Sequence, residues 1–170
     1  MSDEHEPTLD AFTPARLDPA SGVDADEVKR SHDLVRSLTV IPPWSTALTR
    51  WKPVENRTTN LAGTWRGRVL ILSSLRKWDP RGDDVVRRLT GHRLTREQCH
   101  PGHYVGAADL IDAHRGDGTC CAPWGEPGVW HLVMANPVEF TTPIPGTGHL
   151  GLRRVTDTHL THAALTRAHR

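Results

Sequence analysis

The chain has 170 residues, which is enough for one domain with extensions and a single well-filled core. Its net charge of +1 conceals two unlike parts: the first 28 residues hold eight acids and one base, whereas the other 142 hold 20 bases and 12 acids. No apolar run exceeds a few residues, which excludes a membrane-spanning helix. The acidic start lacks the basic and apolar regions of a signal peptide. Three cysteines in such a chain indicate reduced thiols, so we expect a cytoplasmic protein.

The acidic start is also the least patterned part of the chain. Residues 1–25 are rich in Pro, Asp and Ala, and we expect them to form a disordered tail. This tail either only keeps the chain solvated or folds back on the basic part and competes with a polyanion. The folded domain is expected over 26–155, and a C-terminal helix over 156–170.

The patterning of apolar residues predicts a mainly β domain with peripheral helices, of the α+β class. With 14 glycines and 13 prolines and several short strands, a small closed or nearly closed sheet is favoured. The expected elements in chain order are a helix at 26–36, a strand at 38–41, a helix at 43–52, an extended segment at 54–58, a strand at 64–73, a helix at 82–93, strands at 103–113 and 129–140, a turn and strand at 146–154, and an exposed amphipathic helix at 156–169.

The helix at 43–52 and the segment after it are the most informative part. Pro43 suits a first helical turn, and Pro53 disfavours helical geometry at Lys52, so the helix should end there. Glu55 and Arg57 are two residues apart and should point to the same side of an extended segment. One acid and two bases are thereby gathered at the junction of two elements, beside tryptophans.

Five short segments in this order resemble the ASCH domain, a member of the PUA-like superfamily. They are Ile41-Pro42-Pro43-Trp44, Lys52-Pro53-Val54-Glu55-Asn56-Arg57, Trp65-Arg66-Gly67-Arg68, Tyr104-Val105-Gly106-Ala107-Ala108, and a closing set with Trp124, Trp130-His131, Asn136-Pro137, Pro143-Ile144-Pro145 and Gly148 to Leu152. The resemblance spans about residues 38–153. It implies a five- or six-stranded pseudo-barrel with a cleft beside the Pro-Trp helix.

The ASCH family is regarded as binding RNA or nucleobases, and a few members hydrolyse modified cytidine nucleosides or cleave RNA. Carried over residue by residue, the resemblance implies that the cleft is formed by Trp44, Ser45, Lys52, Glu55, Arg57, Arg66 and Trp130. If the chain is an enzyme, Lys52 and Glu55 are the catalytic candidates.

Two departures from the family pattern concern Lys52. The family's lysine usually follows a glycine, whereas Trp51 precedes it here. In the small amidohydrolase branch a threonine stands three residues after the lysine, whereas this chain has Glu55. A carboxylate there would hold Lys52 protonated, and a charged lysine is a poor nucleophile. The substitution counts against amidohydrolase activity.

Each candidate feature also has a plain structural explanation. Lys52, Glu55 and Arg57 could form a salt-bridge set worth less than about 1 kcal/mol. Trp44 and Trp130 could stack on a base or belong to the core, and Trp65 is expected in the core. The bases between residues 66 and 96 could be a solvated face or could contact a nucleic-acid backbone.

Histidines and cysteines also occur together between residues 99 and 121. Structural zinc sites usually have paired ligands at both ends of the motif. Cys120 and Cys121 are adjacent and cannot readily bind one ion together, and no second pair is visible among Cys99, His100, His103 and His114. We therefore expect no metal, no cofactor and free thiols.

Three hypotheses about function follow. The first is a module that binds single-stranded RNA or DNA, or a modified nucleoside. The second is a hydrolase, either a ribonuclease or an amidohydrolase-like enzyme that uses Lys52 and Glu55. The third is a protein–protein adaptor that docks through the C-terminal helix.

Overall fold

The computed structural model describes residues 16–17 and 35–165. Its centre is one mixed sheet, in which the strand order is β1-β6-β5-β4-β2-β7 and β3 pairs with β6. The strands are β1 (Arg16–Leu17), β2 (Val35–Val40), β3 (Val54–Arg57), β4 (Gly67–Ser73), β5 (His103–Arg115), β6 (Trp130–Pro145) and β7 (Leu152–Arg154). The helices are α2 (Trp44–Arg50), α3 (Pro80–Thr90), the 3-10 turn η1 (Glu97–Cys99) and α4 (Thr158–Leu165). The α+β class is confirmed, but the pairings among the described residues leave the sheet open rather than closed.

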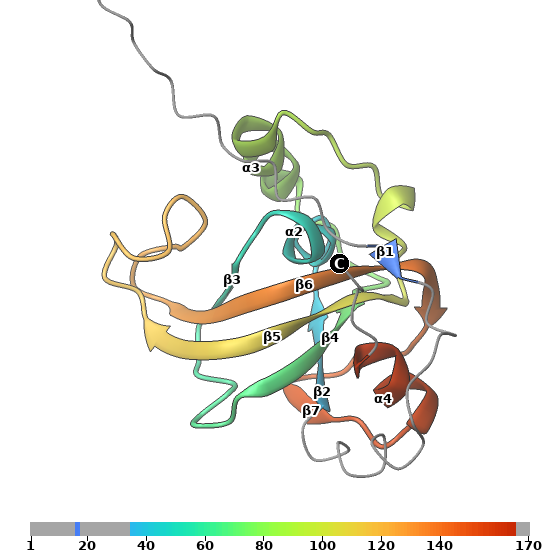
Figure 1. The fold of residues 1–170 in the computed structure, drawn as a ribbon. Helices are drawn as coiled ribbons and strands as arrows, with labels where there is room; N and C mark the ends of the chain where they lie inside the picture. Colours follow the sequence, from blue (N-terminus) through green and yellow to red (C-terminus); the bar gives the residue numbers. More distant parts are fainter. Residues whose placement is uncertain (1–15, 18–34, 166–170) are drawn as a thin grey trace, which may run out of the picture.

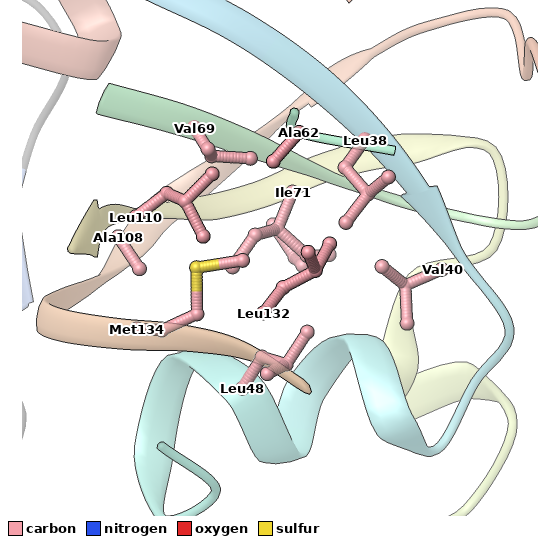
Figure 2. Packing of buried hydrophobic residues seen from close by; sticks show 11 residues of the cluster. Leu38, Val40, Leu48, Ala62, Val69, Ile71, Ala108, Leu110, Leu132 and Met134 are labelled. Carbon is pink, nitrogen blue, oxygen red and sulfur yellow. The ribbon is translucent and has the colours of Figure 1, made fainter. Parts of the chain in front are cut away.

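Strand β4 organises the sheet because its two faces are covered by different helices. Val69 and Ile71 belong to a core cluster with Leu48 of α2, whereas Leu70 and Leu72 belong to a second cluster with Ala163 of α4. The alternation of the side chains along one strand therefore separates two cores. Figure 1 shows α2 and α4 on opposite sides of the sheet, and Figure 2 shows Leu48 pointing from α2 into the first cluster, next to Leu132 and Met134.

Helix α2 is enclosed by the sheet on one side and by α3 on the other. Five of its seven residues are buried. Trp44 Nε1 donates a hydrogen bond to Asp79 Oδ2 at 3.0 Å, and Asp79 caps the N-terminus of α3 through the amide of Arg81. A Cβ added at Gly82 would lie 2.9 Å from atoms of Pro43 and Trp44, so a glycine is needed where the two helices meet.

Most expected elements are present with shifted ends, including those at 38–41, 43–52, 54–58 and 103–113. The expected helix at 26–36 is wrong at its end, because Val35 and Arg36 begin β2; its other residues lie outside the described part. Of the expected disordered tail, Arg16 and Leu17 form β1, which pairs in parallel with Glu139 and Phe140 of β6. The rest of that tail is outside the described residues.

The expectation of an exposed C-terminal helix is wrong over the described part of α4. Thr161, Ala163 and Ala164 are buried, and the last two belong to the second core cluster. The carbonyl of Ala164 also accepts a hydrogen bond from Arg68 Nε at 2.7 Å. Small residues at these positions let the helix pack closely against the sheet.

None of the helices that the structure describes has the length and apolar character to cross a bilayer.

Candidate functional site

The junction between α2 and β3 places Lys52 inside the protein. The amides of Trp51 and Lys52 both bond to the carbonyl of Ala47 at 2.8 Å, and this double contact closes the helix. Pro53 follows and cannot continue it. The chain then enters β3, and the Lys52 side chain is only 3% exposed. The predicted end of the helix is confirmed.

Lys52, Glu55 and Arg57 meet as predicted. Lys52 Nζ lies 3.3 Å from Glu55 Oε2, and Arg57 Nη2 lies 3.0 Å from Glu55 Oε1. Each oxygen of one carboxylate thus faces a different cation. The ammonium group of Lys52 also donates to the carbonyl of Val54, and Arg57 Nη2 donates to the carbonyl of Thr39 at 2.9 Å.

Burial changes the expectation for the charge of Lys52. Desolvation lowers the pKa of Lys52, and the neighbouring Glu55 carboxylate opposes this effect without cancelling it. From the sequence, the Glu55 carboxylate alone predicts that the amine of Lys52 stays protonated. The structure adds the larger opposing effect, since nearly all water is excluded from the ammonium group. Lys52 is therefore easier to deprotonate than an exposed lysine.

These three residues line a pocket of about 140 Å³. The remaining lining residues are Trp44 of α2, Asn56 of β3, Thr58 directly after β3, and Glu126 and Val129 of the loop before β6. Lys52 Nζ lies 5.4 Å from the centre of the Trp44 ring, within the range of a cation–π contact. Arg57 Nε is buried without a hydrogen-bond partner in the described part of the chain. The pocket thus combines an aromatic wall with donors and acceptors.

A second pocket of about 310 Å³ adjoins the first, because both are lined by Trp44, Asn56 and Glu126. Its other lining residues include Trp124 from the loop and Arg81 and Arg88 from α3. The larger pocket therefore carries two exposed arginines that do not line the pocket of Lys52. Together the two volumes reach the range of small-molecule sites.

The structure does not bring every expected cleft residue to this pocket. Ser45 of α2 is fully buried, and its Oγ donates to Ser73 Oγ of β4 at 3.0 Å. Arg66 directly precedes β4, pairs with Asp112 at 3.4 Å and is absent from the pocket lining. Trp130 is the register partner of Arg57 in the sheet, but the pocket is lined by its neighbour Val129. Trp44, Lys52, Glu55 and Arg57 are brought together.

Four of the eight residues that line this pocket were not predicted from the sequence, namely Asn56, Thr58, Glu126 and Val129. Asn56 lies between the two charged residues of β3, and its side chain holds the loop before β6. Its Nδ2 donates to the carbonyl of Trp124 at 2.9 Å, and its Oδ1 accepts from the amide of Glu126 at 3.2 Å. Glu126 then adds a second carboxylate to the pocket wall. Asn56 belongs to the Lys-Pro-Val-Glu-Asn-Arg segment that resembles the ASCH pattern, whereas no local pattern marks Glu126.

Five of the nine bases between residues 66 and 96 are paired with acids, and Arg66 with Asp112 is one of these pairs. Arg68 is buried and contacts Asp109 at 3.0 Å. Three exposed arginines each lie within 3.5 Å of a carboxylate, namely Arg81 with Asp79, Arg87 with Asp84, and Arg93 with Asp83. Arg88, which lines the larger pocket, has no ion pair among the described residues. The stretch is therefore less positive toward a ligand than its sequence suggests.

The tryptophans divide between packing and the pocket. Trp65 packs against the first core cluster, as expected, and Arg36 stacks on its ring at 4.6 Å. Trp51 stacks on His92 with 5.1 Å between ring centres. Trp44 and Trp124 are partly buried against a third core cluster, formed by Ala47, Val86, Leu94 and Cys99, and they also line the pockets. Of the two tryptophans proposed for stacking, Trp44 is at the pocket.

No known protein-family model matches this chain, and no curated protein matches its sequence.

Proposed function

We propose that the pocket beside α2 binds a nucleobase, either within a single strand or as a modified nucleoside, and that the chain is a binding module of the ASCH, PUA-like type. The observation that carries this proposal is the Glu55 carboxylate held between two cations, Lys52 and Arg57, next to the ring of Trp44. The resemblance of the sequence to ASCH domains supports the proposal and adds to it a PUA-like pseudo-barrel.

The chemistry of a base suits this arrangement. Base edges present donors and acceptors side by side. A carboxylate can accept from an exocyclic amine, and a guanidinium or ammonium group can donate to a carbonyl or ring nitrogen. A base that stacks on a tryptophan such as Trp44 gains about 1–3 kcal/mol. Because Glu55 partly neutralises the charges of Lys52 and Arg57, the pocket favours a polar, uncharged part of a ligand beside them.

The phosphate and sugar of such a ligand have a natural place in the adjoining pocket. Its lining includes Arg81 and Arg88, which are exposed and lie on α3. Asp79 also lines it and pairs with Arg81, so the positive charge available to a phosphate is modest. We therefore propose a short contact of one or two nucleotides rather than a long tract of backbone.

The test is a titration of the full chain with unmodified nucleosides, amide-bearing modified cytidines and a short single-stranded RNA. Tryptophan fluorescence measures the binding of each ligand. We expect binding that Glu55→Gln and Arg57→Ala each weaken at least about tenfold, equivalent to about 1.4 kcal/mol. Arg66→Ala is the matched control, since Arg66 lies outside the pocket. If the affinity for the RNA is the same at about 50 and about 200 mM salt, the phosphate contact is contradicted.

A hydrolase acting on modified nucleosides is the second candidate, and the lowered pKa of Lys52 favours it. A buried lysine that loses its proton easily can act as a nucleophile or base, and Glu55 is close enough to exchange a proton with it. The reaction would add water across an amide C–N bond and release an acid and an amine. Lys52→Met separates the candidates, because a binder loses affinity modestly and an enzyme loses turnover by orders of magnitude.

A ribonuclease and an adaptor are less well supported. The adaptor hypothesis depended on an exposed C-terminal helix, and the described part of α4 is packed against the core instead. Strand scission would appear in the same RNA titration as shortened products, so the experiment above also tests the ribonuclease.

A further inference from the structure

Four side chains of the types that can bind a metal lie together at the end of the β5–β6 pair, outside the pocket described above. They are His114 of β5, His131 of β6, and Cys120 and Cys121 of the loop between them, and their ligand atoms all lie within 4.8 Å of one another. Figure 1 shows this loop at the far end of the two long strands. The two histidines are direct register partners across the sheet. This is the second ligand pair that the sequence did not reveal.

Two of the sulfur–nitrogen distances match the edges of a zinc tetrahedron. Zinc binds sulfur at about 2.3 Å and imidazole nitrogen at about 2.0–2.1 Å, so a tetrahedral site has sulfur–nitrogen edges of about 3.6 Å. Cys120 Sγ lies 3.4 Å from His131 Nδ1, and Cys121 Sγ lies 3.7 Å from His114 Nε2. Each sulfur is thus already at the spacing from one imidazole that a shared ion requires.

Both histidines are also oriented as metal ligands usually are. A ligating histidine generally uses its second ring nitrogen to donate to a carboxylate or a backbone carbonyl. His114 Nδ1 lies 2.7 Å from Asp112 Oδ2, and His131 Nε2 lies 2.7 Å from the carbonyl of Glu126. These acceptors favour the tautomers in which the nitrogens that face the sulfurs are free of a proton.

The loop brings the two adjacent cysteines to one side. Asp117 Oδ1 accepts from the amides of Thr119 and Cys120, both at 2.8 Å, which forms a tight turn. Cys121 then adopts a φ of 59°, in the left-handed region. The expectation that neighbouring cysteines cannot share an ion assumed an extended chain, whose side chains alternate. The turn at Cys121 removes that alternation.

Glycines leave the space for the buried histidine. A Cβ added at Gly116 would lie 2.5 Å from the ring of His131, and one at Gly125 would lie 2.6 Å from it. His131 itself has no exposed surface. The ring is therefore held in one orientation by its surroundings as well as by its hydrogen bond.

We propose that His114, Cys120, Cys121 and His131 bind one zinc ion in a closed, structural site. Two thiolates with two imidazoles are typical of zinc among the divalent metals, and four protein ligands leave no open position for a reaction. On binding, two thiol protons are released and the thiolates take up the positive charge of the ion. The ion replaces the two weak thiol–imidazole contacts with four coordinate bonds.

This site would fix one wall of the ligand pocket. The loop that carries both cysteines continues through Trp124 and Glu126, which bond to Asn56 and line the pockets. A bound ion would limit the movement of this loop. The metal proposal does not depend on the identity of the ligand in the pocket, and its test is separate.

The test is metal analysis of the full chain, purified under reducing conditions with zinc present and then dialysed, together with titration of the metal-free chain with Co²⁺. We expect one zinc per chain and, with Co²⁺, the thiolate-to-cobalt charge-transfer band and strong visible bands of a tetrahedral site. Cys120→Ser and Cys121→Ser should each weaken metal binding more than about tenfold. Cys99→Ala is the matched control because Cys99 is buried elsewhere, in the third core cluster, and it should leave the metal content unchanged.

Asp112→Asn gives an independent readout, because it leaves all four ligands in place, removes the carboxylate behind His114 together with its exposed pair with Arg66, and should weaken metal binding about 10- to 100-fold. If a cysteine variant does not fold, competition between the wild-type chain and a chelator, followed by the cobalt bands, decides the outcome. Less than a tenth of an equivalent of metal in the wild-type chain, no thiolate-to-cobalt band, or unchanged affinity in both cysteine variants would overturn the proposal.

Discussion

Lys52 Nζ lies 3.3 Å from Glu55 Oε2, and both side chains are almost completely buried beside the candidate pocket. The carboxylate partly offsets the desolvation of the ammonium group, and its other oxygen pairs with Arg57. Lys52 and Arg57 are therefore both paired with the same carboxylate, that of Glu55. Removal of the Glu55 carboxylate leaves the Lys52 ammonium group buried without its ion-pair partner, which is costly.

We predict that Glu55→Gln lowers the free energy of unfolding by about 3 kcal/mol, the usual effect of breaking a buried ion pair. Urea denaturation followed by tryptophan fluorescence measures this. Asp84→Asn makes the same chemical change in the exposed pair with Arg87, at 3.5 Å, and should cost less than about 1 kcal/mol. Equal losses for the two variants would show that the buried cluster has no special weight.

Leu48 is the only residue of α2 in the buried part of the first core cluster, and it is 1% exposed. Leu48→Ala should lower the free energy of unfolding by about 2–5 kcal/mol, since it removes buried surface and leaves a cavity. Leu150→Ala is the control: Leu150 is 90% exposed, and its loss should change stability by less than about 0.5 kcal/mol. The same denaturation assay applies, and a small effect of Leu48→Ala would mean that α2 is not anchored by this cluster.

At Gly106 of β5, both β6 and α2 approach the strand closely. A Cβ there would lie 2.1 Å from the carbonyl oxygen of Val138 and 2.6 Å from Thr49. Gly106→Ala should therefore destabilise the fold by about 1–3 kcal/mol or more through overpacking. Gly148→Ala, whose Cβ would be at ordinary contact distance from Thr39, should be close to neutral in thermal denaturation. A neutral Gly106→Ala would contradict the described packing of α2 on β5 and β6.

His149 predicts a pH dependence of stability. Burial, and to a lesser extent the charge of Arg153, lowers the pKa of His149 below 6.5, and Nε2 lies 2.7 Å from Ser37 Oγ. Because the unfolded chain takes up the proton first, this contribution is complete above the unfolded pKa and is lost as pH falls through 6.5 toward the lower folded value.

The corresponding measurement is urea denaturation of wild type and His149→Gln between about pH 7.5 and about pH 5. The wild-type chain should lose more stability on acidification than the variant. His159→Gln, at an exposed position, should follow the wild-type curve. Parallel curves for wild type and His149→Gln would rule out this role of burial.

Much of the candidate site could be predicted because its central residues are close in sequence. Lys52, Glu55 and Arg57 depend on one helix end and one short strand, and proline placement together with the two-residue period determines both. The alternation along β4 likewise predicted that Trp65, Val69 and Ile71 share one side.

The remaining features depend on pairings between distant segments. Glu126 reaches the pocket because Asn56, 70 positions earlier, binds its amide. His114 and His131 meet because β5 and β6 pair in one particular register. The burial of α4 depends on Ala163 and Ala164, which pack closely against the sheet but carry little hydrophobic signal of their own. Local periodicity contains none of this information.

The most direct test of the central claim is the affinity of the chain for modified nucleosides and short single-stranded RNA, measured for wild type, Arg57→Ala and Arg66→Ala. Arg57 lines the pocket and contacts Glu55, whereas Arg66 contacts Asp112 outside it. We expect saturable binding that falls at least about tenfold in Arg57→Ala and is unchanged in Arg66→Ala. Absence of binding to every ligand, or equal losses in both variants, would contradict a nucleobase pocket beside α2.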